Sequence, residues 1–113
     1  MKANMTELQL KAWQIRRLVL EMDYQTDSGH IGGAMSSAEI LASLFFGVMQ
    51  HSPERAASKD QTRDRFVLSK GHISDGYYAA LALAGYFPTE ELNTYCGYES
   101  RLSGHPTVKV PGV

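Results

Sequence analysis

The stretch from Phe66 to Gly76 constrains the fold most, because its pattern predicts a short strand, a tight loop and the start of a helix. Phe66 to Leu68 is continuously apolar, as in a strand that is covered on both faces. Gly71 can adopt backbone angles that are closed to other residues and lets a ligand approach the main chain. We expect Ser74 or Asp75 to cap the following helix, whose unpaired N–H groups would attract an anion such as phosphate. The stretch therefore predicts an α/β arrangement with an anion site, and an ordinary strand-to-helix connection is the alternative.

Composition narrows the function classes. The 113 residues suit one small domain, and a net charge of −1 without a basic run gives no field for nucleic acid or an anionic membrane. No apolar run approaches the length of a bilayer span, and the N-terminus lacks the apolar core of a signal peptide. The single cysteine, Cys96, fits a reducing compartment. We therefore expect a cytoplasmic protein with no nucleic-acid or membrane partner.

Four helices are expected from apolar periodicity and capping signals. They cover residues 6–24, Ser36 to about Gln50, a segment after His72 that closes at Gly85, and a segment capped by Thr89. Residues 51–65 are polar and charged, which predicts a solvated connection. The residues expected to face the core are Leu8, Ala12, Ile15, Val19, Met22, Ile40, Leu41, Leu44, Phe45, Val48, Tyr77, Tyr78, Leu92, Tyr95 and Cys96.

Three of the four histidines share one setting. His30, His72 and His105 each follow a glycine in a predicted loop. Core packing does not explain this recurrence, because a buried imidazole needs a hydrogen-bond partner. Two chemistries remain: a metal site with three imidazole ligands, or a polar cleft in which histidines bind phosphate and move protons. We favour the cleft, since the sequence has no histidine pair at helical spacing and no cysteine at ligand spacing.

Three motifs together resemble the opening part of transketolase. They are Ser28-Gly29-His30, the run from Arg63 to His72, and Gly104-His105-Pro106, and their order and spacing also match. The similarity covers nearly the whole chain from about Leu8 and is closest to the N-terminal subunit of split transketolases. It implies that residues 1–113 are the N-terminal portion of a thiamine-diphosphate-binding domain, and that this portion is incomplete. The family's domain is an α/β fold, a parallel sheet with flanking helices, and the part within this chain is expected to be mostly helical.

The resemblance also implies an activity. Transketolases use thiamine diphosphate to transfer a two-carbon ketol unit from a ketose phosphate to an aldose phosphate. The implied partners are therefore sugar phosphates and a C-terminal transketolase subunit, or the remaining domains, in a homo- or hetero-oligomer. The chain alone is expected to be inactive, because the family's Gly-Asp-Gly segment and later asparagine, which bind magnesium or calcium, are not in it. The glutamate that activates the cofactor is likewise expected in another domain.

Site residues follow from the same resemblance. His72 is expected to contact the cofactor's diphosphate, with Gly71 and Ser74 as further cofactor-binding residues. His30 and His105 are expected to be catalytic, aiding proton transfer at the sugar. The residues expected to bind substrate are His30, His105 and Ser28.

One departure from the family pattern keeps alternatives open. Ile31 follows His30, where transketolases commonly have proline. The sugar is therefore undetermined, and a deoxyxylulose-phosphate-synthase-like enzyme stays an alternative, although Gly104-His105-Pro106 favours transketolase. A different class is a non-catalytic helical module for assembly or regulation that retains these motifs.

Overall fold

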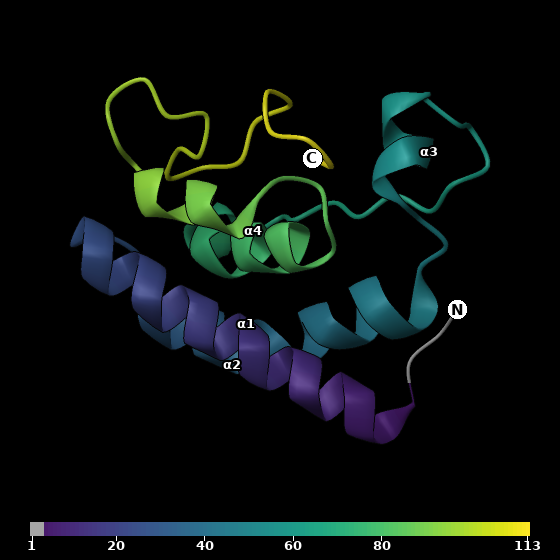
Figure 1. Cartoon of the computed structure of the whole chain (residues 1–113), viewed down its shortest axis with the longest axis horizontal. Helices are drawn as coiled ribbons and strands as arrows, with labels where there is room; N and C mark the ends of the chain where they lie inside the picture. The colour runs from purple at the N-terminus through teal and green to yellow at the C-terminus, as the bar shows by residue number, and fades with distance from the viewer. Residues whose placement is uncertain (1–3) are drawn as a thin grey trace.

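The computed structural model describes residues 4–113, and these residues form helices and loops with no β-strand. Figure 1 shows α1 and α2 side by side, α4 packed across them, and the C-terminal segment on the other side of α4. The α-helices are α1 (Met5–Thr26), α2 (Ile31–Ser43), α3 (Pro53–Ala57) and α4 (Ser74–Leu83). The π-helix η1 (Leu44–Val48) continues α2, and the 3₁₀-helices are η2 (Gly71–Ile73) and η3 (Thr89–Thr94).

The first helix confirms its predicted apolar stripe. Its buried residues are Ala12, Ile15, Val19 and Met22, and Leu8, the first residue of the predicted stripe, is only half-buried. It starts at Asn4, whose Oδ1 accepts a hydrogen bond from the Glu7 amide at 2.9 Å. It ends at Asp27, which adopts the left-handed conformation with φ +51°.

The second helix begins five residues before the predicted start at Ser36, at Ile31, so two glycines lie inside it. Packing overrides the low helix propensity of glycine here. A Cβ atom on Gly33 would lie only 2.7 Å from Ile73 Cγ2, so the missing side chain lets η2 approach α2 closely. Ser36 does not cap the helix; its hydroxyl donates to the Gly33 carbonyl at 3.0 Å.

Two residues predicted for the buried face of this helix are exposed. Ile40 and Val48 are 62% and 58% exposed, so those assignments were wrong, whereas Leu41 and Phe45 are buried as expected. The prediction that no apolar run reaches bilayer length was also wrong. By length and composition alone, the 18 residues Ile31–Val48, with a mean hydropathy of 1.5, are long and apolar enough to span a membrane. Packing in the core accounts for part of this apolarity, since 28% of the window is buried.

The central element is α4, in which nine of ten residues are buried. Tyr77 and Tyr78 belong to the core as predicted, and burial raises the pKa of Tyr77 to about 12. Gly76 faces α2: a Cβ atom there would lie 3.3 Å from the Ala34 Cβ, so the two helices pack closely. Gly85, with φ +93°, follows the helix end, in agreement with the prediction.

The predicted strand Phe66–Leu68 is an extended segment without a ladder partner among residues 4–113. Phe66 packs its ring on Phe45 and Tyr77, at centroid distances of 5.4 and 5.2 Å, whereas Val67 is 82% exposed. The predicted strand and sheet are therefore wrong for residues 4–113, because strand propensity yields a sheet only where a second strand pairs with the first. The prediction that this chain is mostly helical is confirmed. The outward position of Cys96 also contradicts its predicted burial.

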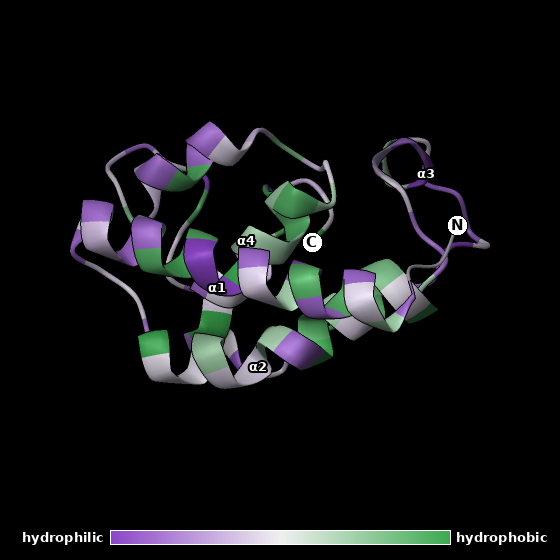
Figure 2. Cartoon of the chain, turned by 60° about the horizontal axis from the view of Figure 1, so that its bottom comes forward, coloured by the Kyte–Doolittle hydropathy of each residue, from purple (hydrophilic) through white to green (hydrophobic). Residues whose placement is uncertain are grey.

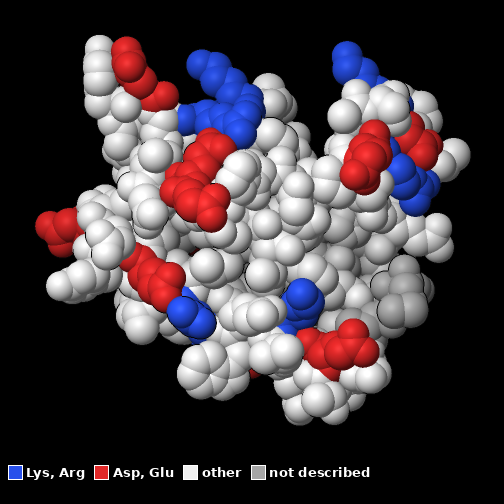
Figure 3. Space-filling view, in the orientation of Figure 1, with Lys and Arg blue, Asp and Glu red and all other residues white. Residues whose placement is uncertain are grey.

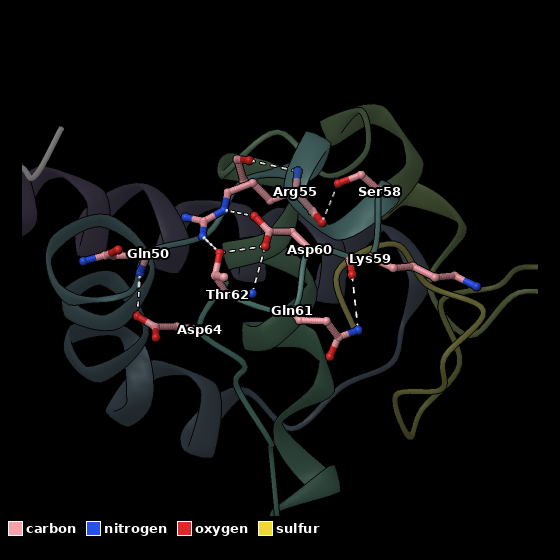
Figure 4. A network of polar contacts seen from close by, with 9 residues as sticks. Gln50, Arg55, Ser58, Lys59, Asp60, Gln61, Thr62 and Asp64 are labelled. Atoms are coloured by element: carbon pink, nitrogen blue, oxygen red, sulfur yellow. Dashed lines mark hydrogen bonds and ion pairs between the residues drawn. The ribbon is translucent and has the colours of Figure 1, made fainter.

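Residues 51–65 form the predicted solvated connection, with the short helix α3 inside it. Figure 4 shows how polar contacts hold it. Arg55 Nε donates to Asp60 Oδ2 at 2.8 Å, and Asp60 Oδ1 accepts from the Thr62 hydroxyl at 2.7 Å. The Thr62 hydroxyl, its amide and Arg55 together hold the pKa of Asp60 well below its usual range. At the end of the connection, the Gln50 amide donates to Asp64 Oδ2 at 2.7 Å.

The surface is mixed in character. In Figure 2, hydrophobic and hydrophilic residues alternate along α1, and Leu10, Trp13 and Leu20 on this helix are exposed. On the face drawn in Figure 3, acidic and basic side chains lie beside each other in small groups separated by uncharged surface. This face therefore shows no extended field of one sign.

Candidate functional site

Three loops bring three histidine side chains together. The His72 ring lies between the other two, with centroids 5.2 Å from His30 and 5.0 Å from His105. The ring planes meet at 90° and 77°, so both contacts are edge-to-face. All three residues are exposed, which leaves their ring nitrogens open to a ligand. The structure thus gathers the predicted site histidines, and their individual roles remain predictions.

His30 is held at the start of α2. It occupies the N-cap position, and its backbone N–H donates to Asp75 Oδ2 at 3.0 Å. The preceding Gly29 has φ +111°, a conformation that glycine adopts at low cost. The loop therefore depends on one glycine and one buried carboxylate from α4.

His72 lies in η2, directly before α4. Its neighbour Gly71 is packed against His105: a Cβ atom on Gly71 would lie 2.5 Å from His105 Cδ2. A side chain on residue 71 would displace the His105 ring from this position. Lys70 precedes Gly71 and is exposed, with Nζ 3.5 Å from the position that a Gly33 Cβ would occupy. A positive charge thus lies where the η2 and α2 segments meet.

Hydrogen bonds from α4 hold the loop of His105. The Tyr78 hydroxyl donates to the Ser103 carbonyl at 2.6 Å, and the Ser74 hydroxyl donates to the Gly104 carbonyl at 2.7 Å. The Ser74 oxygen also lies 2.8 Å from the Tyr95 hydroxyl, and burial raises the pKa of Tyr95. Residues far apart in sequence therefore fix the third loop.

The predicted capping role of Ser74 or Asp75 was wrong. The N-cap of α4 is Ile73, and no side chain caps it. Both polar side chains are fully buried and bind other loops instead, Ser74 at Gly104 and Asp75 at His30. Tertiary partners thus compete successfully with the local cap.

Ser28 lies beside the site but bonds locally. It is half-buried, and its hydroxyl donates to the Thr26 carbonyl at 3.1 Å. The fourth histidine, His51, lies in a separate place, with Nε2 2.7 Å from the Phe45 carbonyl oxygen and Nδ1 2.6 Å from the Tyr86 hydroxyl. A carbonyl oxygen only accepts, so Nε2 carries the proton. Both ring nitrogens of His51 are therefore used within the fold.

The alternative of a metal site finds no support in the described residues. Across residues 4–113, no three histidine, cysteine, aspartate or glutamate side chains are arranged to hold a metal ion. The edge-to-face rings instead form an open polar surface, which suits hydrogen bonding to phosphate or hydroxyl groups.

Sequence reasoning missed one component of the site, the carboxyl group of Asp23 near the end of α1. Burial, together with the neighbouring Asp75 carboxyl, raises the pKa of Asp23 to about 8. Local sequence carries little signal for it, because Asp23 and Asp75 lie 52 residues apart and meet only through the packing of α1 and α4.

Comparison with known proteins identifies the family. Residues 8–113 match the family described as transketolase, thiamine diphosphate binding domain. The chain belongs to this family. It is 39% identical over 106 residues to one subunit of the apulose-4-phosphate transketolase of Phocaeicola vulgatus, covering 94% of this chain and 37% of that protein. It is 46% identical over 105 residues to the 6-deoxy-6-sulfo-D-fructose transketolase subunit SqwG of a Clostridium species, covering 93% of this chain and 38% of that protein.

Solved transketolases share the fold of this chain. The transketolase from Leishmania mexicana matches with a TM-score of 0.85 and 35% identity, over 100% of this chain and 16% of that one. The chain thus spans a little over a third of the Phocaeicola and Clostridium relatives and a smaller part of this longer transketolase.

The residues present fit part of the family's cofactor. Exposed imidazoles and the Lys70 ammonium are suitable donors to a diphosphate, and Gly71 provides a main-chain surface without a side chain. The described residues offer no oxygen-rich cluster for the divalent cation. This part of a transketolase domain therefore has donors for the diphosphate and none grouped for its metal.

Proposed function

We propose that this chain is the cofactor-binding part of a split transketolase, which transfers a two-carbon ketol unit from a ketose phosphate to an aldose phosphate. The observation that carries the proposal is the cluster in which the exposed rings of His30 and His105 each contact the ring of His72, in a member of the transketolase family. It works with a second subunit or further domains that complete the active site. We propose the cytoplasm as its location.

The diphosphate end of thiamine diphosphate would be held from η2. His72 would donate a hydrogen bond to a phosphate oxygen, and the main chain at Gly71 would permit close approach. Lys70, one residue earlier, would add positive charge. When bound, the cofactor supplies the carbon centre at which the carbon–carbon bond is broken and formed. Magnesium or calcium ligands would come from outside residues 4–113.

The sugar would lie against the other two histidines. His30 and His105 flank His72 and would hydrogen-bond to the sugar hydroxyls, giving and taking protons as the oxygen charges change. Ser28 would contribute a further contact to the sugar. Ser74 would act from behind, because its buried hydroxyl holds the carbonyl of Gly104 and so positions His105.

The substrate is proposed to be a specialised sugar phosphate. Two relatives are named as subunits of transketolases for apulose-4-phosphate and for 6-deoxy-6-sulfo-D-fructose. Their names also support a partner subunit for this chain. Ile31, which follows His30 and is exposed at the start of α2, is the residue of this loop that we expect to influence the choice of sugar.

The test is cofactor binding by the chain reconstituted with the remaining transketolase domains as a separate chain. His72→Ala should weaken thiamine diphosphate binding in the presence of magnesium by roughly 10- to 100-fold, because a charge-assisted hydrogen bond contributes about 1.5–3 kcal/mol. Calorimetric titration measures the dissociation constant. Lys109→Ala, an exposed cation in the C-terminal segment, is the control and should bind as the wild type does. Equal affinity for His72→Ala and wild type would remove His72 from the cofactor site. A defined complex that forms without any dependence on thiamine diphosphate would favour the non-catalytic module instead.

A further inference from the structure

Two carboxyl groups meet beneath the His30 loop. Asp23 lies in the last turn of α1, and Asp75 lies in the first turn of α4. Asp75 is fully buried, and both carboxyl oxygens of Asp23 are also shielded from solvent. Buried acidic side chains are uncommon unless they are paired, so the arrangement calls for a physical explanation.

The two carboxyl groups differ in their partners. Asp75 Oδ2 accepts the His30 backbone N–H at 3.0 Å, and Asp75 Oδ1 accepts the Gly76 N–H at 2.9 Å. The Asp23 oxygens accept no hydrogen bond from any described residue. Within residues 4–113, neither carboxyl group takes part in an ion pair with a cation. The neighbouring group that Asp23 does face is Asp75.

A single proton on this pair of carboxyl groups removes the repulsion between them. Two ionised carboxylates cannot hydrogen-bond to each other, and their repulsion is strong in a buried site. If Asp23 carries the proton, its O–H donates to the Asp75 carboxylate, and the desolvation of a second charge is avoided. Asp75 keeps its negative charge, which strengthens the hydrogen bond that it accepts from the His30 amide.

We propose that Asp23 and Asp75 share one proton and together act as a positioning pair that holds the His30 loop at the histidine cluster. The pair acts on the main chain of His30, and the His30 ring remains free to contact His72. It therefore sets the place of a site residue without touching a ligand.

Further contacts tie Asp23 to the same loop. The Asp23 carbonyl accepts the Ser28 N–H at 3.2 Å. The Asp23 carboxyl group also lies against the Cα atom of Gly29, where a Cβ atom would overlap with it. Asp23 thus contacts the loop through main chain and side chain, and Asp75 contacts the next residue.

The groups around Asp23 come from three segments of the chain. Asp75 comes from α4, His30 from the loop, and Tyr95 from the residue after η3, where its hydroxyl lies on Ser74. Burial is the main cause that raises the pKa of Asp23 to about 8, and the hydrogen bond and charge of Asp75 add to it. Asp23 is therefore expected to be protonated at pH 7.

The first test is a carbon-13 NMR titration of the aspartate carboxyl groups in the whole chain. Asp23 should titrate near pH 8, and the His30 amide resonance should move with the same midpoint. A midpoint for Asp23 at its ordinary value of 3.8 would overturn the proposal.

The second test uses Asp23→Asn, because the asparagine amide can donate to Asp75 as a protonated acid would. This variant should keep the His30 amide near its low-pH position and abolish its movement at about pH 8. Asp27→Asn, placed where the left-handed backbone suits asparagine, should leave the midpoint unchanged. A His30 midpoint that persists in Asp23→Asn would overturn the proposal. If this variant does not fold, the wild-type titration still decides.

Stability gives an independent readout. The folded-state pKa of Asp23 lies above its unfolded value of 3.8, so the folded state holds more protons between about pH 4 and pH 8. The wild-type Tm should therefore fall as the pH rises from about 4 to about 8, and the fall should be smaller in Asp23→Asn. An equal fall in the two proteins would count against the shared proton. The role assigned to the pair, holding a site residue in place, rests on the proposed function. The titration and stability measurements need no cofactor. A normal cofactor affinity in His72→Ala would therefore contradict the proposed role of His72 without contradicting the shared proton.

Discussion

Helix α4 and the connection of residues 51–65 are held in opposite ways. Almost every residue of α4 is buried, and the side chains of Ser74, Asp75 and Tyr78 each bind a loop of the candidate site. The connection is polar and largely solvated. Its two ends bond outside the segment, His51 to Phe45 and Tyr86 and Asp64 to the Gln50 main chain, whereas the contacts between them, such as Arg55 with Asp60, stay within it. The difference shows that the histidine cluster depends on α4, whereas the part of the connection between His51 and Asp64 holds mainly itself.

The largest effect is expected from the core of α4. Leu81→Ala removes a fully buried side chain and should lower the free energy of unfolding by about 2–5 kcal/mol. Urea denaturation measures this change. The control, Val67→Ala, lies just beyond the connection at an exposed position and should change it by less than about 0.5 kcal/mol. Similar losses for both variants would contradict the contrast between α4 and the connection.

A smaller effect is expected from one hydroxyl on the same helix. Tyr78→Phe removes the donor to the Ser103 carbonyl and should cost about 1 kcal/mol of unfolding free energy. It should also shift the amide resonance of His105, because the third loop loses an attachment. Tyr98→Phe, at a 96% exposed tyrosine, is the matched control and should do neither. An unchanged His105 resonance in Tyr78→Phe would show that the loop is held by other contacts.

The smallest effect is expected in the connection. Asp60→Asn removes a carboxylate whose pKa is lowered in the folded state. Such a group stabilises the fold at pH values above its ordinary pKa, and this stabilisation is lost as the pH falls through the folded-state pKa. At pH 7 the variant should lower Tm by less than Tyr78→Phe does, and high salt should reduce the difference further. Thermal unfolding at two salt concentrations measures it. A Tm loss larger than that of Tyr78→Phe would mean that the connection supports the rest of the fold.

Helices with a strong local signal could be predicted from the sequence. The stripe of α1 and the course of α4 follow from apolar spacing and from the glycine after Leu83 and Ala84. The start of α2 could not be predicted from the sequence, because two glycines near its beginning suggest a loop. Their place in the helix depends on the close approach of Ile73, which lies 40 residues further along the chain.

The candidate site shows the same division. The recurrence of glycine before His30, His72 and His105 was enough to predict that these residues act together, and the structure places their rings side by side. The way in which these loops are held was not predicted. Asp75 and Ser74 have the composition of a helix cap, and only the tertiary structure reveals that each serves a different loop. The prediction of a strand at Phe66–Leu68 was wrong for a related reason. A strand needs a second segment to pair with, and the sequence pattern concerned only one segment.

His51 links the ends of α2 and α4 that lie opposite the histidine cluster. Helix α2 starts at His30, and α4 follows directly from His72, so both helices begin at the cluster. At their other ends, the wide turn of η1 presents the Phe45 carbonyl to His51, which also binds Tyr86 just after α4. The two helices and this bridge form a closed frame. The distance between two of the three imidazoles is thereby set partly by a fourth imidazole at the opposite end, where no reactant needs to come.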